Sequence, residues 1–234
     1  IWDALYGEME GRLPGVDSTP PVEFKGWSYY TRMEEGKSYP IHARKQVRPR
    51  NRRQAAEVTL LDSNLRAEGQ VYYHSRGIRV SPDQARMVWS EDTTGNEIYT
   101  LYVKDLETGE LLGDPIGDTS GDVEWAADSE TLFFTSLDET HRPSTLKRRR
   151  VDGVGGVEEL YTENDTRFYM ELELSRSQAY LFLELSSPLT SEVRVLRADQ
   201  PEGRFELLAP RHEGVLYSVA HNGEGFIVRT NAPE

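Results

Sequence analysis

The chain has 234 residues, of which 37% are hydrophobic and 29% are charged, and it contains no cysteine. This composition favours a folded globular protein over a disordered one, and no apolar run reaches the roughly 20 residues that cross a bilayer. Without cysteine there is no disulfide, thiolate metal site or thiol nucleophile. The net charge of -13 disfavours non-specific phosphate binding and favours encounter with cationic partners such as basic peptides. We expect a soluble protein, placed in the cytoplasm with an organelle as the alternative.

Helix is scarce along the chain. The first element is a short helix predicted over residues 3–10, where Leu5 and Met9 lie four residues apart and Asp3 stands near the start as a cap. Three runs then favour strands: GWSYYTR, YPIHARK and AEVTLLD. They form an incomplete first unit, extended by a basic insert at residues 48–53.

Four later stretches share one pattern, which is a short alternating run, a polar turn, and a longer apolar run. They align on Asp83, Asp128, Ser177 and Asn222, which are separated by 45, 49 and 45 residues. Each stretch is typical of a β-hairpin. Two further strands follow the hairpin, for example NEIYTLYVKDL and ELLGDPI after Asp83, and SEVRVLRAD and RFELLAP after Ser177.

Four strands per repeat at this spacing indicate the blades of a β-propeller. We predict an all-β fold with about four or five blades, the first strand of each lying innermost. Residues 1–20 form a lead-in segment, and residues 21–234 form an incomplete propeller domain. A β-sandwich with evenly spaced hairpins is the alternative.

The sequence shows little sign of catalytic chemistry. No Gly-x-Ser-x-Gly elbow occurs, and no phosphate-binding Gly-x-x-x-x-Gly-Lys segment occurs. The five histidines lack metal-ligand spacing, and a calcium loop at Asp114, Asp118 and Asp122 is the weaker interpretation of a solvated loop. We therefore predict no catalytic residue, no metal and no cofactor within this chain.

Two basic runs interrupt the acidic background. RPRNRR, at residues 48–53, is interpreted as an exposed loop insert, with nuclear targeting or nucleic-acid binding as the alternative. KRRR, at residues 147–150, is interpreted as an outward-facing edge strand whose charges oppose aggregation. Neither run outweighs the net negative charge, and we predict neither a nucleic-acid nor a membrane partner.

The stretch SLDETHRPSTL is the one candidate contact site. Asp138, Glu139 and Arg142 crowd the connection between the second and third strands of one blade. Such a polar loop can contact another domain or a peptide. The alternative is an arginine tied to its own loop by carboxylates.

An ordered series of short words along the chain resembles the N-terminal propeller of the prolyl oligopeptidase family, within it the oligopeptidase B branch. The resemblance covers nearly the whole chain and rests on the order and spacing of the words. The words are EMEGR, YPIHARK, SPD, EIYTLYVKDLETGE, LDETHRP, SRS, TSEV, APRHEG and TNA.

The resemblance implies a seven-bladed propeller that covers an α/β-hydrolase domain carrying the catalytic Ser, Asp and His. The branch cleaves short peptides after Lys or Arg, and the propeller admits oligopeptides while excluding folded proteins. None of the catalytic positions matches a residue of this chain. Seven blades need roughly 320 residues at this spacing, so we expect a piece of a longer serine oligopeptidase.

A second hypothesis makes the chain a stand-alone, non-catalytic propeller that acts as a protein-interaction scaffold. It predicts that residues 1–234 fold cooperatively as a soluble monomer. The first hypothesis predicts unpaired blade faces and aggregation of the isolated piece.

Overall fold

The computed structural model describes residues 2–12, 15–48 and 55–232, and the chain divides into two compact units, Ile1–Val71 and Tyr72–Glu234. β-strands dominate both units, as the sequence predicts, and the strands form antiparallel sheets. Among the described residues, no helix has the length and apolar character needed to cross a membrane.

The first unit contains one antiparallel sheet, with helix α1 before it and the short helix α2 after it in the chain. Helix α1 confirms the predicted helix at residues 3–10, but Asp3 lies inside its first turn and is not its cap. The short helix α2 was not predicted. The Asp62 carboxylate caps α2 by accepting a hydrogen bond from the Asn64 backbone N–H at 2.9 Å. Beyond Arg48, the basic insert lies outside the described residues. The elements are α1 (Trp2–Glu10), β1 (Asp17–Ser18), β2 (Val22–Phe24), β3 (Trp27–Met33), β4 (Ile41–Gln46), β5 (Glu57–Asp62) and α2 (Ser63–Ala67).

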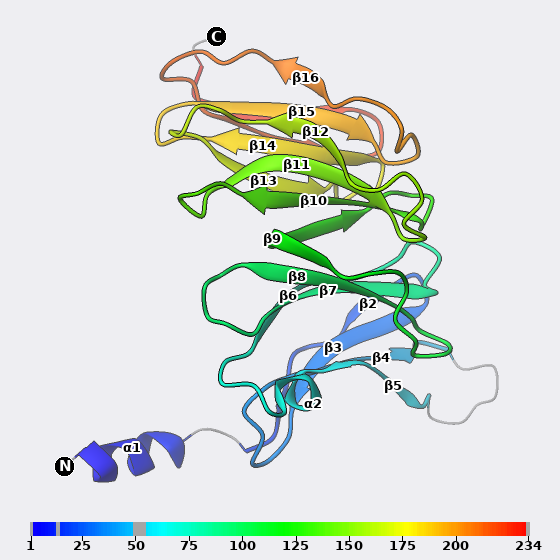
Figure 1. Ribbon diagram of the computed structural model, residues 1–234, viewed down its shortest axis with the longest axis vertical. Coiled ribbons are helices and arrows are strands. Elements are labelled where there is room, and N and C mark those ends of the chain that lie inside the picture. Colours follow the sequence, from blue (N-terminus) through cyan, green and yellow to red (C-terminus); the bar gives the residue numbers. More distant parts are fainter. Residues whose placement is uncertain (1, 13–14, 49–54, 233–234) are drawn as a thin grey trace. The chain divides into compact units, whose positions relative to one another are not determined.

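The second unit contains successive antiparallel blades, which we name by their first strands: the β6, β9, β13 and β17 blades (Figure 1). The polar turns that anchor the repeat each join the first two strands of a blade. The strands are β6 (His74–Val80), β7 (Arg86–Asp92), β8 (Tyr99–Asp105), β9 (Ile116–Trp125), β10 (Thr131–Leu137), β11 (Pro143–Arg150), β12 (Glu158–Thr162), β13 (Tyr169–Leu174), β14 (Tyr180–Ser186), β15 (Ser191–Arg197), β16 (Glu206–Ala209), β17 (Tyr217–His221) and β18 (Phe226–Thr230).

The four-strand pattern is confirmed in the β9 and β13 blades and is modified in the β6 blade. There, Leu111 makes a single bridge to Lys104, and the first half of β9 pairs with β8 through Ile116 and Thr119. The second half of β9 pairs with β10. One strand thus ends one blade and begins the next, so β6 to β12 form a continuous sheet. The described part of the β17 blade has two strands.

The core of the second unit lies between consecutive blades. Leu132 and Phe134 of β10 pack with Val88 and Leu101 of the β6 blade, and Phe133, on the opposite face of β10, packs toward the β13 blade. A strand buried on both faces has a continuous apolar sequence, which explains the run Thr131–Leu137. The β13 and β17 blades share a third cluster built from Phe182, Val193, Val195 and Val219. Consecutive blades of this unit therefore bury their facing surfaces against each other.

The hairpin turns of the four blades share a backbone feature that the sequence pattern did not reveal. The residue after each anchor has a positive φ: 68° at Gln84, 61° at Ser129, 64° at Gln178 and 102° at Gly223. This left-handed conformation destabilises an L-residue by roughly 1 kcal/mol, whereas glycine adopts it without that cost. Three of the four turns therefore carry removable backbone strain.

We expect Gln178→Gly to stabilise the protein by about 0.5–1 kcal/mol, because Gln178 has a φ of 64°. The change is measurable as a shift of the urea or thermal unfolding midpoint. Gln178→Ala is the matched control, since it removes the same side chain but keeps a Cβ in the left-handed region. Equal stability of the two variants would contradict the strain argument.

The interpretation of the basic run at residues 147–150 as an edge strand is wrong. Strand β11 lies inside its sheet, because β12 pairs along its outer side and sets Glu158 and Glu159 opposite Arg148 and Lys147. Arg148 is 8% exposed and forms ion pairs with Glu158 at 2.5 Å and Glu202 at 3.0 Å. Cross-strand pairing of opposite charges, rather than protection of a free edge, accounts for this run.

Candidate functional site

The loop between β10 and β11, residues 138–142, is closed by its own hydrogen bonds. The Asp138 backbone N–H donates to the Arg142 carbonyl at 2.9 Å. The Asp138 Oδ1 accepts from the Thr140 backbone N–H at 2.9 Å, from the Thr140 hydroxyl at 2.7 Å and from the Arg142 backbone N–H at 3.1 Å. Aspartate commonly folds turns in this way. The loop is therefore a defined structure with little freedom of its own.

Arg142 is the last residue of this loop and is 5% exposed. Its Nε donates to the Asp138 Oδ2 at 2.9 Å. Its terminal nitrogens donate to the carbonyls of Phe168 at 2.6 Å and Glu163 at 3.0 Å, with a longer contact of 3.4 Å to the Asp165 carbonyl. This is the arrangement of an arginine tied to its own loop by a carboxylate, extended to the chain segment at residues 163–168.

Glu139 differs from the other two predicted contact residues. It is exposed, and its carboxylate makes no hydrogen bond or ion pair with any residue in the ranges 2–12, 15–48 and 55–232. The structure thus brings Asp138 and Arg142 together, while Glu139 keeps a solvated negative charge in the same loop. Contact with a substrate or another domain stays a prediction for all three residues.

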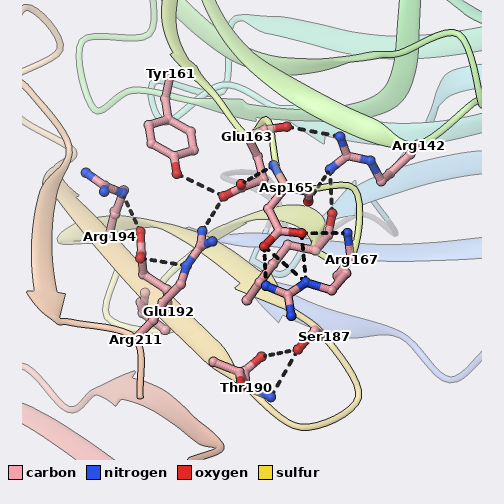
Figure 2. A network of polar contacts seen from close by, with 12 residues as sticks. Arg142, Tyr161, Glu163, Asp165, Arg167, Ser187, Thr190, Glu192, Arg194 and Arg211 are labelled. Atoms are coloured by element: carbon pink, nitrogen blue, oxygen red, sulfur yellow. Dashed lines mark hydrogen bonds and ion pairs between the residues drawn. The ribbon is translucent and has the colours of Figure 1, made fainter. Parts of the chain in front are cut away.

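Arg142 belongs to a polar network that links the β9 and β13 blades (Figure 2). The crossover between these blades, residues 163–168, begins with Glu163, which is 5% exposed. The Glu163 carboxylate accepts hydrogen bonds from the Tyr161 hydroxyl at 3.0 Å, from the Asp165 backbone N–H at 2.8 Å and from Arg211. The network comprises Arg142, Tyr161, Glu163, Asp165, Arg167, Glu192, Arg194 and Arg211.

The network continues onto the β13 blade through Arg211, which follows β16. The Arg211 Nε lies 2.8 Å from the Glu192 Oε2, and the Arg194 Nε lies 2.7 Å from the Glu192 Oε1. The guanidinium of Arg211 stacks over the Phe168 ring at 3.8 Å, and that of Arg194 over the Tyr161 ring at 4.5 Å. Two arginines of the network are thereby held against aromatic rings, one from the β9 blade and one from the crossover.

Three carboxyl groups of this site, those of Asp138, Glu163 and Asp165, have a pKa below the ordinary value. Burial tends to raise the pKa of Glu163, but hydrogen bonds from Arg211, the Asp165 N–H and Tyr161 outweigh it and the pKa is lowered. The pKa of Asp138 is lowered to about 2, because hydrogen bonds from Thr140 and Arg142 outweigh the opposing effect of burial. The hydrogen bond from Arg167 lowers the pKa of Asp165 to about 2. These acids are suited to structure rather than to proton transfer near neutral pH.

The sequence did not reveal Tyr161, Glu163, Glu192 and Arg211 as members of one site. Two of them lie in words that carry the family resemblance, Glu192 in TSEV and Arg211 in APRHEG. No spacing rule connects Glu163 to Arg211, because they are 48 residues apart and meet only when two blades stack. The words that carry the family resemblance were therefore the one signal in the sequence that pointed to these residues. They mark single positions in the chain and do not show which side chains contact each other.

Two of the histidines and one aspartate of the calcium-loop alternative make polar contacts with residues far away in the sequence. His74 Nδ1 lies 2.8 Å from the Tyr99 hydroxyl, and His221 Nδ1 lies 2.7 Å from the Ser177 hydroxyl. Asp122 forms an ion pair with Arg76 at 2.5 Å. Within the described part of the chain, no three His, Asp or Glu side chains gather in a way that could hold a metal ion.

We expect Asp138→Asn to destabilise the protein by on the order of 1–2 kcal/mol at pH 7, with a much smaller effect near pH 2. The folded-state pKa of Asp138, about 2, lies below its ordinary value of 3.8. The stabilisation by its charge is therefore present above about pH 4 and is lost as the pH falls toward 2. Urea unfolding of both proteins between pH 7 and pH 2 measures the difference.

The control for this measurement is Asp199→Asn. Asp199 pairs with Arg197 on the surface, where both side chains are more than half exposed, so water and salt screen the pair. We expect its substitution to change stability little at any pH. A difference between wild type and Asp138→Asn that stays constant across the pH range would refute the role of the Asp138 charge.

Comparison with known proteins agrees with this architecture. The model of the prolyl oligopeptidase N-terminal β-propeller domain matches residues 1–233. The chain is 34% identical over 233 residues to "Protease 2" of Moraxella lacunata and 34% identical over 247 residues to "Dipeptidyl aminopeptidase BI" of Pseudoxanthomonas mexicana. Each alignment covers 98% of this chain and 34% of the relative.

Solved structures give the same result. Oligopeptidase B from Leishmania major has a TM-score of 0.89 at 27% identity, covering 98% of this chain and 33% of that protein. Oligopeptidase B from Trypanosoma brucei, in a closed form with covalently bound antipain, has a TM-score of 0.85 at 26% identity. The match covers 98% of this chain and 32% of that protein. The chain thus spans about a third of the relatives it matches. It belongs to the N-terminal β-propeller domain family of the prolyl oligopeptidases.

Proposed function

We propose that this chain is the non-catalytic, substrate-gating propeller of a serine oligopeptidase similar to oligopeptidase B. The match of residues 1–233 to one domain of relatives about three times as long carries this proposal. Residues 1–20 are the lead-in segment, and residues 21–234 belong to the propeller. The catalytic Ser, Asp and His lie in a C-terminal α/β-hydrolase domain of the same protein, which is the principal partner.

The substrates are short peptides cleaved after Lys or Arg, in the cytoplasm. The net charge of -13 supports this assignment, because an acidic propeller attracts basic peptides over several ångströms and raises their local concentration. The propeller excludes folded proteins by size, and opening between the two domains admits the peptide. The propeller itself supplies access control rather than bond-breaking groups.

The loop at residues 138–142 is the proposed contact with the hydrolase domain or its substrate. Glu139 supplies the contact, because its exposed carboxylate has no cationic partner among the described residues. Asp138 and Arg142 support it by fixing the loop through the hydrogen bonds described above. A cationic group of the hydrolase domain or a basic side chain of the peptide is the complementary partner.

Helix α1 offers a second contact with the hydrolase domain. Trp2, Leu5, Tyr6 and Met9 follow the spacing of one helix face, and none of them is buried. An apolar stripe of this kind is expected to pack against another surface. The lead-in segment is thus proposed to lie against the hydrolase domain in the full-length protein.

We expect this chain alone not to hydrolyse an Arg-containing peptide, and the full-length protein to do so. The chain has no Gly-x-Ser-x-Gly segment, so a serine nucleophile must come from downstream. The test extends the reading frame beyond Glu234, expresses both forms and measures release of a reporter from the peptide. Turnover by the chain alone that a serine-directed inhibitor abolishes would overturn the proposal. A stop codon soon after Glu234 would favour the scaffold hypothesis instead.

A further inference from the structure

Arg142 connects two segments that are far apart in the sequence, the β10–β11 loop and the crossover at residues 163–168. One guanidinium serves both, because its Nε binds the Asp138 carboxylate and its terminal nitrogens bind crossover carbonyls 21 and 26 residues away. Five planar donors in a fixed fork suit this simultaneous binding, and a lysine ammonium does not reproduce the geometry.

The corresponding loop of the preceding blade closes without an arginine. There, the Asp92 carboxylate alone accepts from the backbone N–H groups of Thr94, Gly95 and Glu97 at 2.8, 3.0 and 2.9 Å. The same aspartate arrangement closes the loop at Asp138. Closure of the loop therefore does not need the terminal nitrogens of Arg142, whose contacts are made with the crossover.

The crossover is fixed from its other side by the β13 blade. Arg211 binds the Glu163 carboxylate and also Glu192 on β15, so the crossover lies between two arginines (Figure 2). Arg142 holds its carbonyls, and Arg211 holds its first side chain. Contacts with the β13 blade, made through the crossover, therefore help to fix the position of the β10–β11 loop, in addition to contacts within its own blade.

We infer that Arg142 is a positioning residue, which docks the β10–β11 loop onto the crossover and so sets where the loop presents Glu139. Glu139 directly follows Asp138, whose carboxylate receives both the backbone N–H and the Nε of Arg142. Without Arg142 the loop keeps its internal turn but loses its attachment. This inference rests on the proposed contact of Glu139 with the hydrolase domain or the peptide.

The test is a double-mutant cycle in the full-length protein, with kcat and KM measured separately on an Arg-containing peptide. We expect Arg142→Met to lower kcat/KM about tenfold in the wild-type background and less than twofold when Glu139→Gln is already present, because the two residues act through one contact. Arg142→Lys should show nearly the same loss of kcat/KM as Arg142→Met, because a lysine ammonium does not reproduce the contacts of the guanidinium. Arg167→Met is the matched control, since Arg167 is 75% exposed and pairs with Asp165 without touching the loop.

Hydrogen exchange of the same proteins supplies the structural readout. Arg142→Met should raise exchange in both residues 138–142 and residues 163–168, and Arg167→Met should leave the loop unchanged. Equal losses of kcat/KM from Arg142→Met in both backgrounds would overturn the positioning role and leave the proposed contact intact. A Glu139→Gln variant with unchanged kinetics would overturn both the contact and the inference.

Discussion

Replacing Gly77 with alanine is expected to destabilise the protein by more than about 3 kcal/mol, one of the largest effects of any single substitution here. Gly77 has a φ of 60°, and a Cβ at this position would lie 2.4 Å from the Gly121 carbonyl oxygen. That oxygen also accepts the Ser90 hydroxyl at 3.0 Å, so it is held in place. Strands β6 and β9 approach each other here, and only a residue without a side chain fits between them. Urea unfolding measures the loss.

Gly109→Ala is the matched control for Gly77→Ala. Gly109 also has a positive φ, 76°, but no atom lies within 4 Å of the position of an added Cβ. The Gly109→Ala variant should therefore lose only roughly 1 kcal/mol of unfolding free energy, which is the cost of the left-handed conformation for alanine. The difference between the two variants isolates the close approach of β6 and β9. Equal destabilisation would show that the backbone conformation alone requires glycine at Gly77.

The second large effect is expected at the polar network, where Arg211→Met should cost about 3–5 kcal/mol at pH 7. Methionine fills a similar volume, but it leaves Glu163 and Glu192, which are 5% and 6% exposed, without their shared cation. An uncompensated buried charge is the main cost. Unfolding of wild type and variant by urea at several pH values gives the size and the pH dependence of the effect.

The pH dependence distinguishes this charge effect from lost packing. The pKa of Glu163 is held below its ordinary value partly by Arg211, so the stabilisation exists above that value and declines as the pH falls through the folded-state pKa. The deficit of Arg211→Met should therefore shrink at acid pH. Adding Glu163→Gln and Glu192→Gln to Arg211→Met should recover stability at pH 7. A deficit independent of pH, with no recovery, would assign the effect to the stacking of Arg211 on Phe168.

The blade repeat could be predicted from the sequence because it depends on local patterns. The polar turns at Asp83, Asp128, Ser177 and Asn222 recur at nearly constant spacing, and each lies between the first two strands of a blade. Alternation and turn chemistry act over a few residues, so they are readable along the chain. The family words added the expectation of a larger peptidase, which the comparisons support at the level of the domain family.

The contents of the candidate site could be predicted only in part. The sequence singled out Asp138, Glu139 and Arg142 as one group. It did not show that Asp138 and Arg142 hold the loop closed while Glu139 stays exposed. The basic run at residues 147–150 was misplaced on an edge, because the pairing of β12 outside β11 depends on which strands come together. Charge patterns alone do not distinguish a solvated run from a cross-strand ladder.

The amino-acid pattern alone predicts the repeating hairpin and the all-β architecture, and the 234 residues contain no serine elbow. Only the folded protein shows that Arg142, Glu163, Glu192 and Arg211 join into one network across two blades. Strand pairing follows a local periodicity of two residues, which the sequence displays directly. Contacts between stacked blades depend on the rotation and register of whole sheets, and these are fixed by the packing of buried side chains far apart in the chain.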